Sequence, residues 1–389
     1  MSYSIRTLQT LMCTPGIAGR RGLRALFWGK PGVGKTAQLE ALTEAMGAVL
    51  ITIIASIREP ADFLGLPMPD GKNGVIYAAP AWARRANDQA AAGKLVVVFI
   101  DELTTCAPAV QAALLRVVNE GYVGDVKLHP NVVFLGAANP PDIAAGGYDL
   151  SPPTANRWMH LDWQDPSATD FSEGILSDWA DTLNAESALK VIERIDGKFE
   201  NTQAKAKGLI TGFLRKNSQH LIAMPSLDNP DASRAWPSLR TWELTIKAIA
   251  GAEANGLEDT EADILIEGCI GRGVAGELRQ YQAEADLPSP EKLLDASDYK
   301  KVWKHNPERP DITAAVLNSC AALVTPKKAT KRKERAEALW GILGGVVKSA
   351  ADVAVISARS IARAGLTTSP TARKVMVKMG PVMAAMGDI

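Results

Sequence analysis

The N-terminal part of the chain alternates short apolar runs with segments of helical periodicity. The apolar runs have the length of strands and end at glycine or polar residues; they are Leu26–Trp28, Ala48–Ile54, Leu95–Ile100 and Val132–Ala138. The run Ala48–Ile54 is rich in β-branched residues, which is typical of a strand buried on both faces of a parallel sheet. Strands that alternate with helices predict an α/β fold class with a parallel sheet.

The C-terminal part of the chain predicts a helical region. Amphipathic patterns cover residues 261–283, 311–324, 331–348, 350–364 and 371–386. Leu287-Pro288-Ser289-Pro290 interrupts these patterns and indicates a linker, because proline and serine favour turns between helices. The stretch 172–224, between the two parts, shows a long and irregular pattern.

The amino-acid composition narrows the classes of protein to which the chain can belong. The 389 residues are 47% hydrophobic and 22% charged, as in an ordinary globular protein of two or three domains. No apolar stretch has the length of a membrane span, and the N-terminus lacks a secretory apolar region, so we expect no membrane partner. The four cysteines lie far apart in sequence, which argues against zinc and disulfides and fits a cytoplasmic location.

Charge is distributed unevenly along the chain. From Thr325 to the end there are twelve Lys and Arg against four Asp and Glu, a net charge of +8. The whole chain is neutral, so the preceding residues carry −8. This asymmetry indicates an acidic partner, a nucleic acid or the acidic face of a neighbouring subunit, with a solvated basic helix face as the alternative.

One segment fits the P-loop pattern G-x-x-x-x-G-K-[ST] at every fixed position, between a strand and a helix. Its glycines allow backbone N–H groups to point inward, and the helix N-terminus adds a positive dipole end, so the turn is suited to phosphate. We expect Lys35 to reach the β- and γ-phosphates and Thr36 to bind Mg²⁺. The predicted cofactor-binding residues are Gly29, Pro31, Gly32, Val33, Gly34, Lys35, Thr36 and Ala37.

Two adjacent carboxylates, Asp101 and Glu102, follow the apolar run Leu95–Ile100. In a doubly wound sheet, ligands bind at this end of the strands. The pattern is that of a Walker B motif, in which Asp101 is a metal residue that holds Mg²⁺ together with Thr36. Glu102 is predicted to orient and deprotonate the attacking water. Asn139 ends the next apolar run, where its side chain can hydrogen-bond this water or the γ-phosphate, or can form a turn before proline.

In this order and spacing, the P-loop, Ile100-Asp101-Glu102-Leu103, Asn139 and Asn156-Arg157 resemble an AAA+ ATPase of the MoxR family. The resemblance implies that Asn139 is the sensor-1 residue and that Arg157 is an arginine finger. It also implies that Trp236-Pro237-Ser238-Leu239-Arg240 begins the sensor-2 helix, with Arg240 over the nucleotide. The alternatives are an ion pair of Arg157 with Asp162 or Asp165, and one of Arg240 with Glu243.

The resemblance covers about residues 20–255 and implies a domain order. We expect an AAA+ α/β nucleotide-binding domain at 1–165, a helical lid at 166–256 and a helical C-terminal region at 257–389. Asp70–Tyr77 resembles the helix-2 insertion of the family, and Gly121–Leu128 resembles its pre-sensor-1 hairpin.

The resemblance further implies ATP and Mg²⁺ as cofactors, a homo-oligomeric ring such as a hexamer, and chaperone-like remodelling or activation of a protein client. In the family this client is often a von Willebrand factor A domain protein. Two alternatives stay open, namely a DNA- or RNA-associated ATPase that uses the basic C-terminal region, and a nucleotide-gated scaffold without turnover. The intact Glu102 argues against the scaffold.

Overall fold

The computed structural model describes residues 3–140, 143, 147–176 and 183–385, and parts of the expected lid and C-terminal region lie outside these ranges. The chain divides into two compact units. Unit 1 comprises Met1–Gly197 and Ile222–Gly273, and unit 2 comprises Lys198–Leu221 and Val274–Ile389. The helices α8 (Ala188–Lys216) and α11 (Arg272–Ala285) contribute residues to both units. No helix of the described residues is long and apolar enough to cross a membrane.

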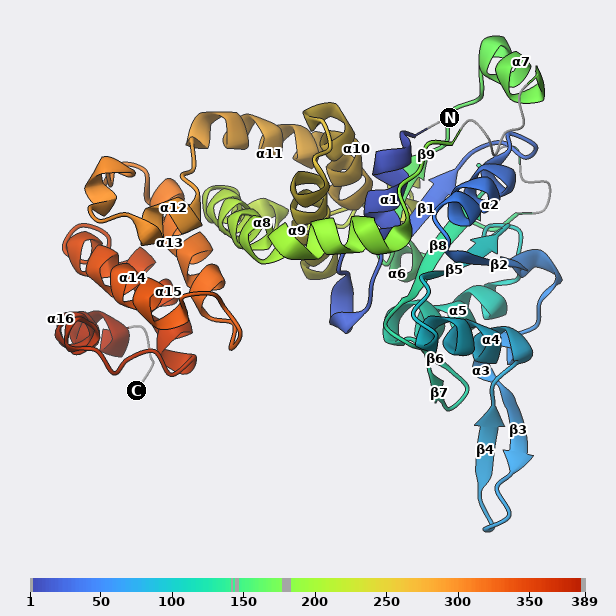
Figure 1. The fold of residues 1–389 in the computed structure, drawn as a ribbon, viewed down its shortest axis with the longest axis horizontal. Helices are drawn as coiled ribbons and strands as arrows, with labels where there is room; N and C mark the ends of the chain where they lie inside the picture. Colours follow the sequence, from blue (N-terminus) through green and yellow to red (C-terminus); the bar gives the residue numbers. More distant parts are fainter. Residues whose placement is uncertain (1–2, 141–142, 144–146, 177–182, 386–389) are drawn as a thin grey trace. The chain divides into compact units, whose positions relative to one another are not determined.

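Unit 1 is built around a five-stranded parallel sheet in the order β2-β5-β8-β1-β9 (Figure 1). Its strands are β1 (Ala25–Trp28), β2 (Val49–Ile54), β5 (Val96–Asp101), β8 (Val132–Ala138) and β9 (Met159–Asp162). The fold class and the parallel sheet are thus as predicted. Because β8 lies between β5 and β1, the segments that follow these three parallel strands lie close together at the carboxyl ends of the strands.

Helices cover both faces of this sheet. Those of unit 1 are α1 (Ile5–Cys13), α2 (Lys35–Ala45), α3 (Ala61–Leu64), α4 (Ala81–Ala91), α5 (Pro108–Glu120), α6 (Pro152–Ala155), α7 (Ala168–Leu176), α9 (Leu239–Asn255) and α10 (Asp259–Ile270). Short 3₁₀ helices span Ile17–Gly19, Ala55–Ile57 and Pro230–Ser233. Every residue of β8 is buried, as expected for a central strand between two helical layers.

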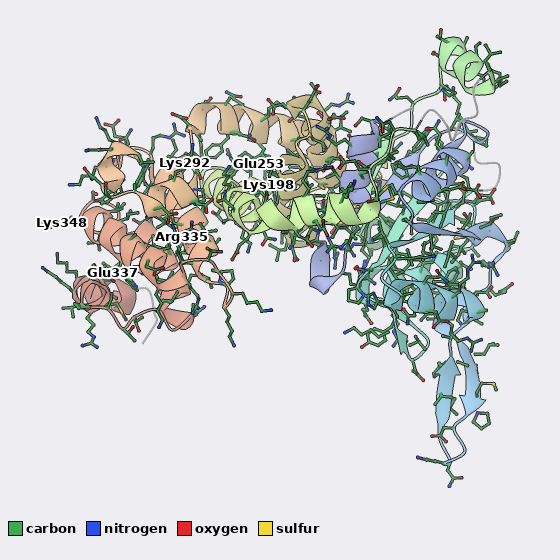
Figure 2. The ribbon with its side chains drawn as sticks, in the orientation of Figure 1. Lys198, Glu253, Lys292, Arg335, Glu337 and Lys348 are labelled. Carbon is green, nitrogen blue, oxygen red and sulfur yellow. The ribbon has the colours of Figure 1, made fainter. Side chains whose placement is uncertain are left out.

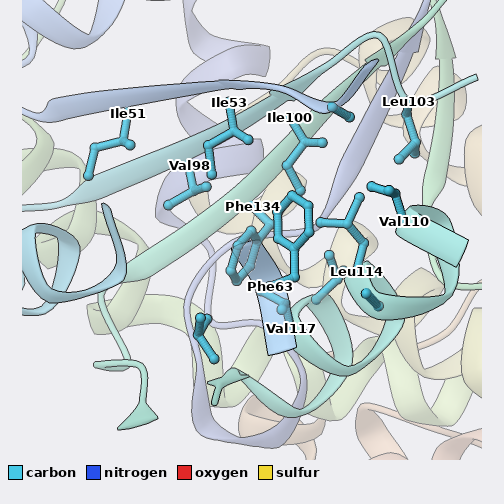
Figure 3. Packing of buried hydrophobic residues seen from close by; sticks show 14 of the residues in the cluster. Ile51, Ile53, Phe63, Val98, Ile100, Leu103, Val110, Leu114, Val117 and Phe134 are labelled. Atoms are coloured by element: carbon cyan, nitrogen blue, oxygen red, sulfur yellow. The ribbon is translucent and has the colours of Figure 1, made fainter. Parts of the chain in front are cut away.

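The core on one face of the sheet is formed by alternate strand residues (Figure 3). Ile51, Ile53, Val98, Ile100 and Phe134 from the sheet pack with Phe63, Val110, Leu114 and Val117 from α3 and α5. Burial of such side chains contributes roughly 1.5–3 kcal/mol each relative to exposure. This packing fixes the positions of the strand ends relative to one another. The geometry of any site at the carboxyl ends of the strands depends on these positions.

Two hairpins extend from unit 1. The first, β3 (Leu66–Pro69) with β4 (Val75–Ala78), projects away from the sheet (Figure 1) and turns at Asp70, whose carboxylate accepts N–H bonds from Lys72 and Gly74. The second is β6 (Tyr122–Val123) with β7 (Val126–Lys127). The Tyr77 N–H donates to Asp125 Oδ2 (2.7 Å), and the Asp125 N–H donates to Tyr77 O (3.1 Å). The two expected insertions therefore contact each other.

Unit 2 is helical. Besides parts of α8 and α11 it contains α12 (Pro290–Asp295), α13 (Pro310–Val324), α14 (Arg332–Val346), α15 (Ala351–Arg363) and α16 (Pro370–Ala385), with 3₁₀ turns at Ser218–His220 and Tyr299–Lys301. Arg335, labelled in Figure 2, is buried and donates to Asp295 and Glu291 of α12. Hydrogen bonds from Arg335 lower the pKa of Asp295 to about 2.

Three expectations about elements were wrong. The strand β2 is an edge strand with Ile54 41% exposed, so it is not buried on both faces. The pattern over 261–283 forms two helices, because Gly271 has a positive φ (+81°) that residues with a side chain rarely adopt, and this ends α10. The irregular stretch 172–224 contains the 29-residue helix α8.

Candidate active site

The P-loop connects β1 to α2, and its conformation depends on glycine. Gly34 caps the N-terminus of α2 with φ +84°, and Gly32 has φ +79°, both in the left-handed region where a side chain is strained. A Cβ on Gly29 would lie 2.9 Å from Trp163 Cβ. The loop thus turns tightly into the N-terminus of an 11-residue helix, an arrangement that binds anions.

Lys35 is buried within this loop with 7% of its surface exposed. Its Nζ donates to Gly29 O (2.8 Å) and to Lys30 O (2.9 Å). Burial lowers the pKa of Lys35, and the charge of Asp101 opposes this shift. A buried ammonium bonded to neutral carbonyls gains stability when an anion approaches, so the residues fit a phosphate group.

The predicted metal residues lie side by side. Thr36 Oγ1 donates to Asp101 Oδ2 over 3.1 Å, which joins the first turn of α2 to the end of β5. A hydroxyl and a carboxylate in this position are oxygen ligands of the kind that Mg²⁺ prefers, so they fit this ion. Among the described residues there is no cluster of three or more His, Cys, Asp or Glu side chains that could hold a metal by themselves.

Glu102 follows Asp101 in a left-handed conformation (φ +60°), which is uncommon for a residue with a side chain. Its N–H donates to Asp101 Oδ1 (2.8 Å), and its carboxylate accepts a hydrogen bond from Ser56, just after β2. The strained turn separates the directions of the two adjacent carboxylates, so that one can face the metal position and the other a neighbouring water. Ser56 was not identified from the sequence.

Asn139 follows β8, between the ends of β5 and β1. Its backbone is fixed by Thr104, whose Oγ1 accepts the Asn139 N–H (3.2 Å) and donates to Asn139 O (3.0 Å). The Leu103 N–H donates to Ala137 O, which joins the same two segments. The structure thus brings Asn139 to the carboxyl ends of the strands, where Lys35 and Asp101 also lie.

Arg157 lies near the amino ends of the strands, whereas the P-loop follows the carboxyl end of β1. The strands β1 and β9 are parallel, with Ala25 opposite Met159 and Trp28 opposite Asp162. At about 3.3 Å per residue, Met159 lies about 13 Å before the level of Gly29, where the P-loop begins, and Arg157 precedes Met159 in the turn after α6. The acids considered as its alternative partners are engaged elsewhere, since Asp162 pairs with Arg234 (3.0 Å) and Asp165 pairs with Lys30 (2.5 Å).

Arg240 lies beside Arg157, and its place over the nucleotide stays a prediction. Its guanidinium donates to Asn156 Oδ1 (3.3 Å), an acceptor shared with Ser238 Oγ (2.7 Å). Burial lowers the pKa of Arg157, and the charge of Arg240 adds to the effect. The physical reason for the placement is the capping box of α9, which ties Ser238 to Thr241 and to the segment before β9.

Arg234 and His160 were not identified from the sequence. The Arg234 guanidinium lies 4.0 Å from the centroid of the Trp28 ring, one residue before the P-loop. Trp28 Nε1 donates to His160 Nδ1 (2.9 Å), and His160 Nε2 lies 2.9 Å from Ala155 O. Burial lowers the pKa of His160 to about 4, so the ring is neutral near pH 7. No sequence motif marks either residue.

Comparison with known proteins matches part of the first domain to a family model. Residues 25–145 match the model described as ATPase family associated with various cellular activities (AAA). The matched segment is less than half of the chain. It contains the P-loop, both carboxylates and Asn139.

One similar solved structure is that of a "putative ATPase" from Cytophaga hutchinsonii. It has a TM-score of 0.46 and 15% sequence identity, and the match covers 72% of this chain and 88% of that chain. No curated protein matches the sequence.

Proposed function

We propose that this protein is an ATP-hydrolysing AAA+ ATPase of the MoxR kind, which works as a ring to remodel or activate a protein partner. The observation that carries the proposal is the meeting of Lys35, the Thr36–Asp101 pair, Glu102 and Asn139 at the ends of three adjacent strands. ATP with Mg²⁺ supplies a phosphoryl group that is transferred to water. The protein contributes positioning and charge neutralisation, which are most of what this reaction requires.

The residues of the P-loop act on the phosphates. Lys35 places its ammonium beside them, while backbone N–H groups and the N-terminus of α2 supply further positive potential. Thr36 and Asp101 would hold the metal through a hydroxyl and a carboxylate. These groups are held in place before the substrate binds, so little reorganisation accompanies the reaction.

Glu102 is the proposed general base. Its carboxylate takes the proton of the attacking water, and Asn139 orients this water or the γ-phosphate with its amide. The hydrogen bond from Ser56 competes for the same carboxylate. Release of this bond is therefore part of reaching the active arrangement.

Arg157 and Arg240 are proposed to act on the nucleotide of a neighbouring subunit. Both lie near the amino ends of the strands, away from their own P-loop, and Arg24 adds a buried guanidinium there. Burial lowers the pKa of Arg24 to about 10, with repulsion from Arg20, Arg240 and Arg157 acting in the same direction. Such an excess of positive charge suits an anion from outside the chain, and this supports a ring, for which a hexamer is our proposal.

The partner is proposed to be a protein, for instance one with a von Willebrand factor A domain. The projecting β3–β4 hairpin exposes apolar side chains, including Leu66, Met68, Val75 and Ile76. Exposed apolar groups on a hairpin are typical of surfaces that contact other proteins. The cytoplasm is the proposed location.

Substitution of Glu102 by Gln tests the proposal, because Gln is close in shape but cannot accept a proton at neutral pH. Glu102→Gln is expected to bind ATP with unchanged affinity and to lose at least about 10²-fold of the hydrolysis rate. Glu44→Gln is the matched control, since Glu44 is exposed on α2. Phosphate release and nucleotide titration are the measurements. Hydrolysis by Glu102→Gln at the rate of the control would refute Glu102 as the base.

A further inference from the structure

Unit 2 contains a groove with a strongly basic lining. The groove has a volume of about 880 Å³ and lies where the C-terminal ends of α13 and α15 meet the start of α14, the helices shown in orange and red in Figure 1. Its described lining consists of Thr325, Lys327, Arg332, Ile356, Arg359, Ser360, Arg363 and Ala364. Half of these residues are cations and none is acidic. The volume is sufficient for a few residues of a peptide.

One of the four cations has a structural role. Arg332 donates to Val324 O (3.2 Å), Thr325 O (3.2 Å) and Ala364 O (2.9 Å), which are carbonyls at the ends of α13 and α15. It therefore caps both helices. Each helix C-terminus carries roughly −0.5 charge, so the four cations of the lining exceed both termini together by about three charges. The helix ends alone do not account for the basic lining.

Three acids of α15 and α12 are engaged by other cations. Asp352 on α15 pairs with Arg215, and Glu291 and Asp295 both pair with Arg335. Lys327 and Arg363 are exposed at the groove. Their charges are thus available to a ligand that brings its own carboxylates or phosphates.

The remaining lining distinguishes between classes of anion. Ile356 is 45% exposed, and with Ala364 it gives the groove an apolar part. The described lining contains no aromatic ring, whereas sites for single-stranded nucleic acid stack bases on aromatic side chains. A surface with both cations and an exposed aliphatic side chain suits a peptide that carries acidic and apolar residues.

We propose that this groove binds an acidic segment of the protein partner, with Lys327 and Arg363 facing its carboxylates and Ile356 facing an apolar side chain. The inference rests on the proposed function in one respect, namely that the partner is a protein. Binding itself requires no nucleotide, because every residue of the lining belongs to unit 2.

The test is a binding titration with the full chain in the absence of nucleotide. The probes are a fluorescein-labelled peptide of alternating Glu and Leu, and a labelled oligothymidylate of the same length. The double variant Lys327→Glu, Arg363→Glu replaces two exposed cations, and Lys348→Glu is the control on an exposed residue of unit 2 outside the lining (Figure 2). We expect the double variant to bind the peptide at least about tenfold more weakly, because attractive pairs become repulsive.

The control variant is expected to retain peptide affinity within about twofold, since surface charges outside the site act only at long range. Three results would overturn the proposal: no binding of the peptide to the unchanged protein, tighter binding of the oligothymidylate, or equal losses in the double variant and in the control. If the double variant does not fold, as judged by thermal unfolding, the pair Lys327→Gln, Arg363→Gln takes its place. ATP hydrolysis, measured separately, shows whether the proposed function itself fails.

Discussion

Among single residues, Lys35 depends most on a group that the chain does not supply. It is buried and bonded to two neutral carbonyls, while the nearby carboxylate of Asp101 accepts a hydrogen bond from Thr36. Burial of a charge without a close counter-ion is unfavourable, so the P-loop region is stabilised when an anion binds.

A residue-scale prediction concerns Ser56, which donates a hydrogen bond to the Glu102 carboxylate. A hydrogen bond to a charged group is worth about 1.5–3 kcal/mol, and this one occupies the carboxylate that is proposed to take the proton of the attacking water. Ser56→Ala is therefore expected to raise the basal rate of ATP hydrolysis by about two- to tenfold with unchanged ATP affinity. Steady-state phosphate release measures the rate.

Ser56→Thr is the control, because it keeps the hydroxyl and is expected to behave like the unchanged protein. A slower rate in Ser56→Ala would contradict the prediction. It would mean that Ser56 holds Glu102 in its active orientation rather than away from it.

The elements differ in how well the sequence predicts them. The strands β1, β5 and β8 and the residues at their ends follow from apolar runs that stop at polar positions, so the parallel sheet and the meeting of Lys35, Asp101 and Asn139 were predictable. The sequence also contains the pattern that predicts helix α8. Residues at helical spacing are buried along it, namely Val191, Ile195, Phe199, Ala206 and Phe213. The irregular composition around this stripe obscured it.

Other parts could not be predicted. The strand β9 has only four residues, of which His160 and Asp162 are polar, so local pattern does not mark it as a strand. The placement of Arg234 and Arg240 depends on how α9 packs against the segment before β9, and this is a long-range contact without a local signal. The sequence therefore identified the residue types of the site better than the side of the sheet on which each arginine lies.

An element-scale prediction follows from His160, which bridges Trp28 on β1 and Ala155 on α6. Its pKa is about 4 when folded and 6.5 when unfolded. Above pH 6.5 both states are neutral and stability does not depend on this group. As the pH is lowered from 6.5 to 4, the unfolded state binds the proton first. The free energy of unfolding therefore decreases on acidification, by on the order of 3 kcal/mol in total.

Urea unfolding of unit 1, followed by tryptophan fluorescence at several pH values, measures this dependence. His160→Gln, which cannot titrate, is expected to be less stable at pH 7 but to lose less stability on acidification to pH 4. Equal slopes in the variant and in the unchanged protein would show that His160 does not control the acid sensitivity of this unit.

At the scale of the whole molecule, the two compact units do not follow the order of the sequence, because residues 198–221, which include the C-terminal part of α8, pack in unit 2. Gly208 lies against α13, where a Cβ would come within 2.4 Å of Ala315 O and 2.6 Å of Ser319 Cβ. Gly197 on the same helix has no atom within 4 Å of such a Cβ. The two glycines form a matched pair for testing unit 2.

Gly208→Ala is expected to destabilise unit 2 by about 1–3 kcal/mol through overpacking. Gly197→Ala is expected to be neutral or to stabilise by up to about 1 kcal/mol, since alanine favours a helix. Calorimetry measures both, and ATP affinity is expected to be unchanged in each. Loss of ATP binding in Gly208→Ala would show that the nucleotide site depends on the packing of unit 2.

The last whole-molecule prediction tests the ring through Arg157. It precedes β9, a strand whose first residue lies about 13 Å before the level of the P-loop of its own chain. An arginine finger contributes on the order of 10³-fold or more in rate, roughly 4 kcal/mol of transition-state stabilisation. Arg157→Ala is therefore expected to bind ATP but not to hydrolyse it. Lys35→Ala is expected to lose ATP binding, because no cation then meets the β- and γ-phosphates.

Each of these variants keeps the half of the site that the other lacks. In a mixed ring, a Lys35→Ala subunit can present its intact Arg157 to an Arg157→Ala neighbour that holds ATP in an intact P-loop. Mixing the two inactive proteins is therefore expected to restore part of the hydrolysis rate, with each protein alone as the control. If phosphate release stays absent although labelled subunits are shown to share rings, Arg157 acts within its own chain or has no catalytic role. The proposal that neighbouring subunits share the active site would then lose its main support, because hydrolysis would not depend on the Arg157 of a second chain.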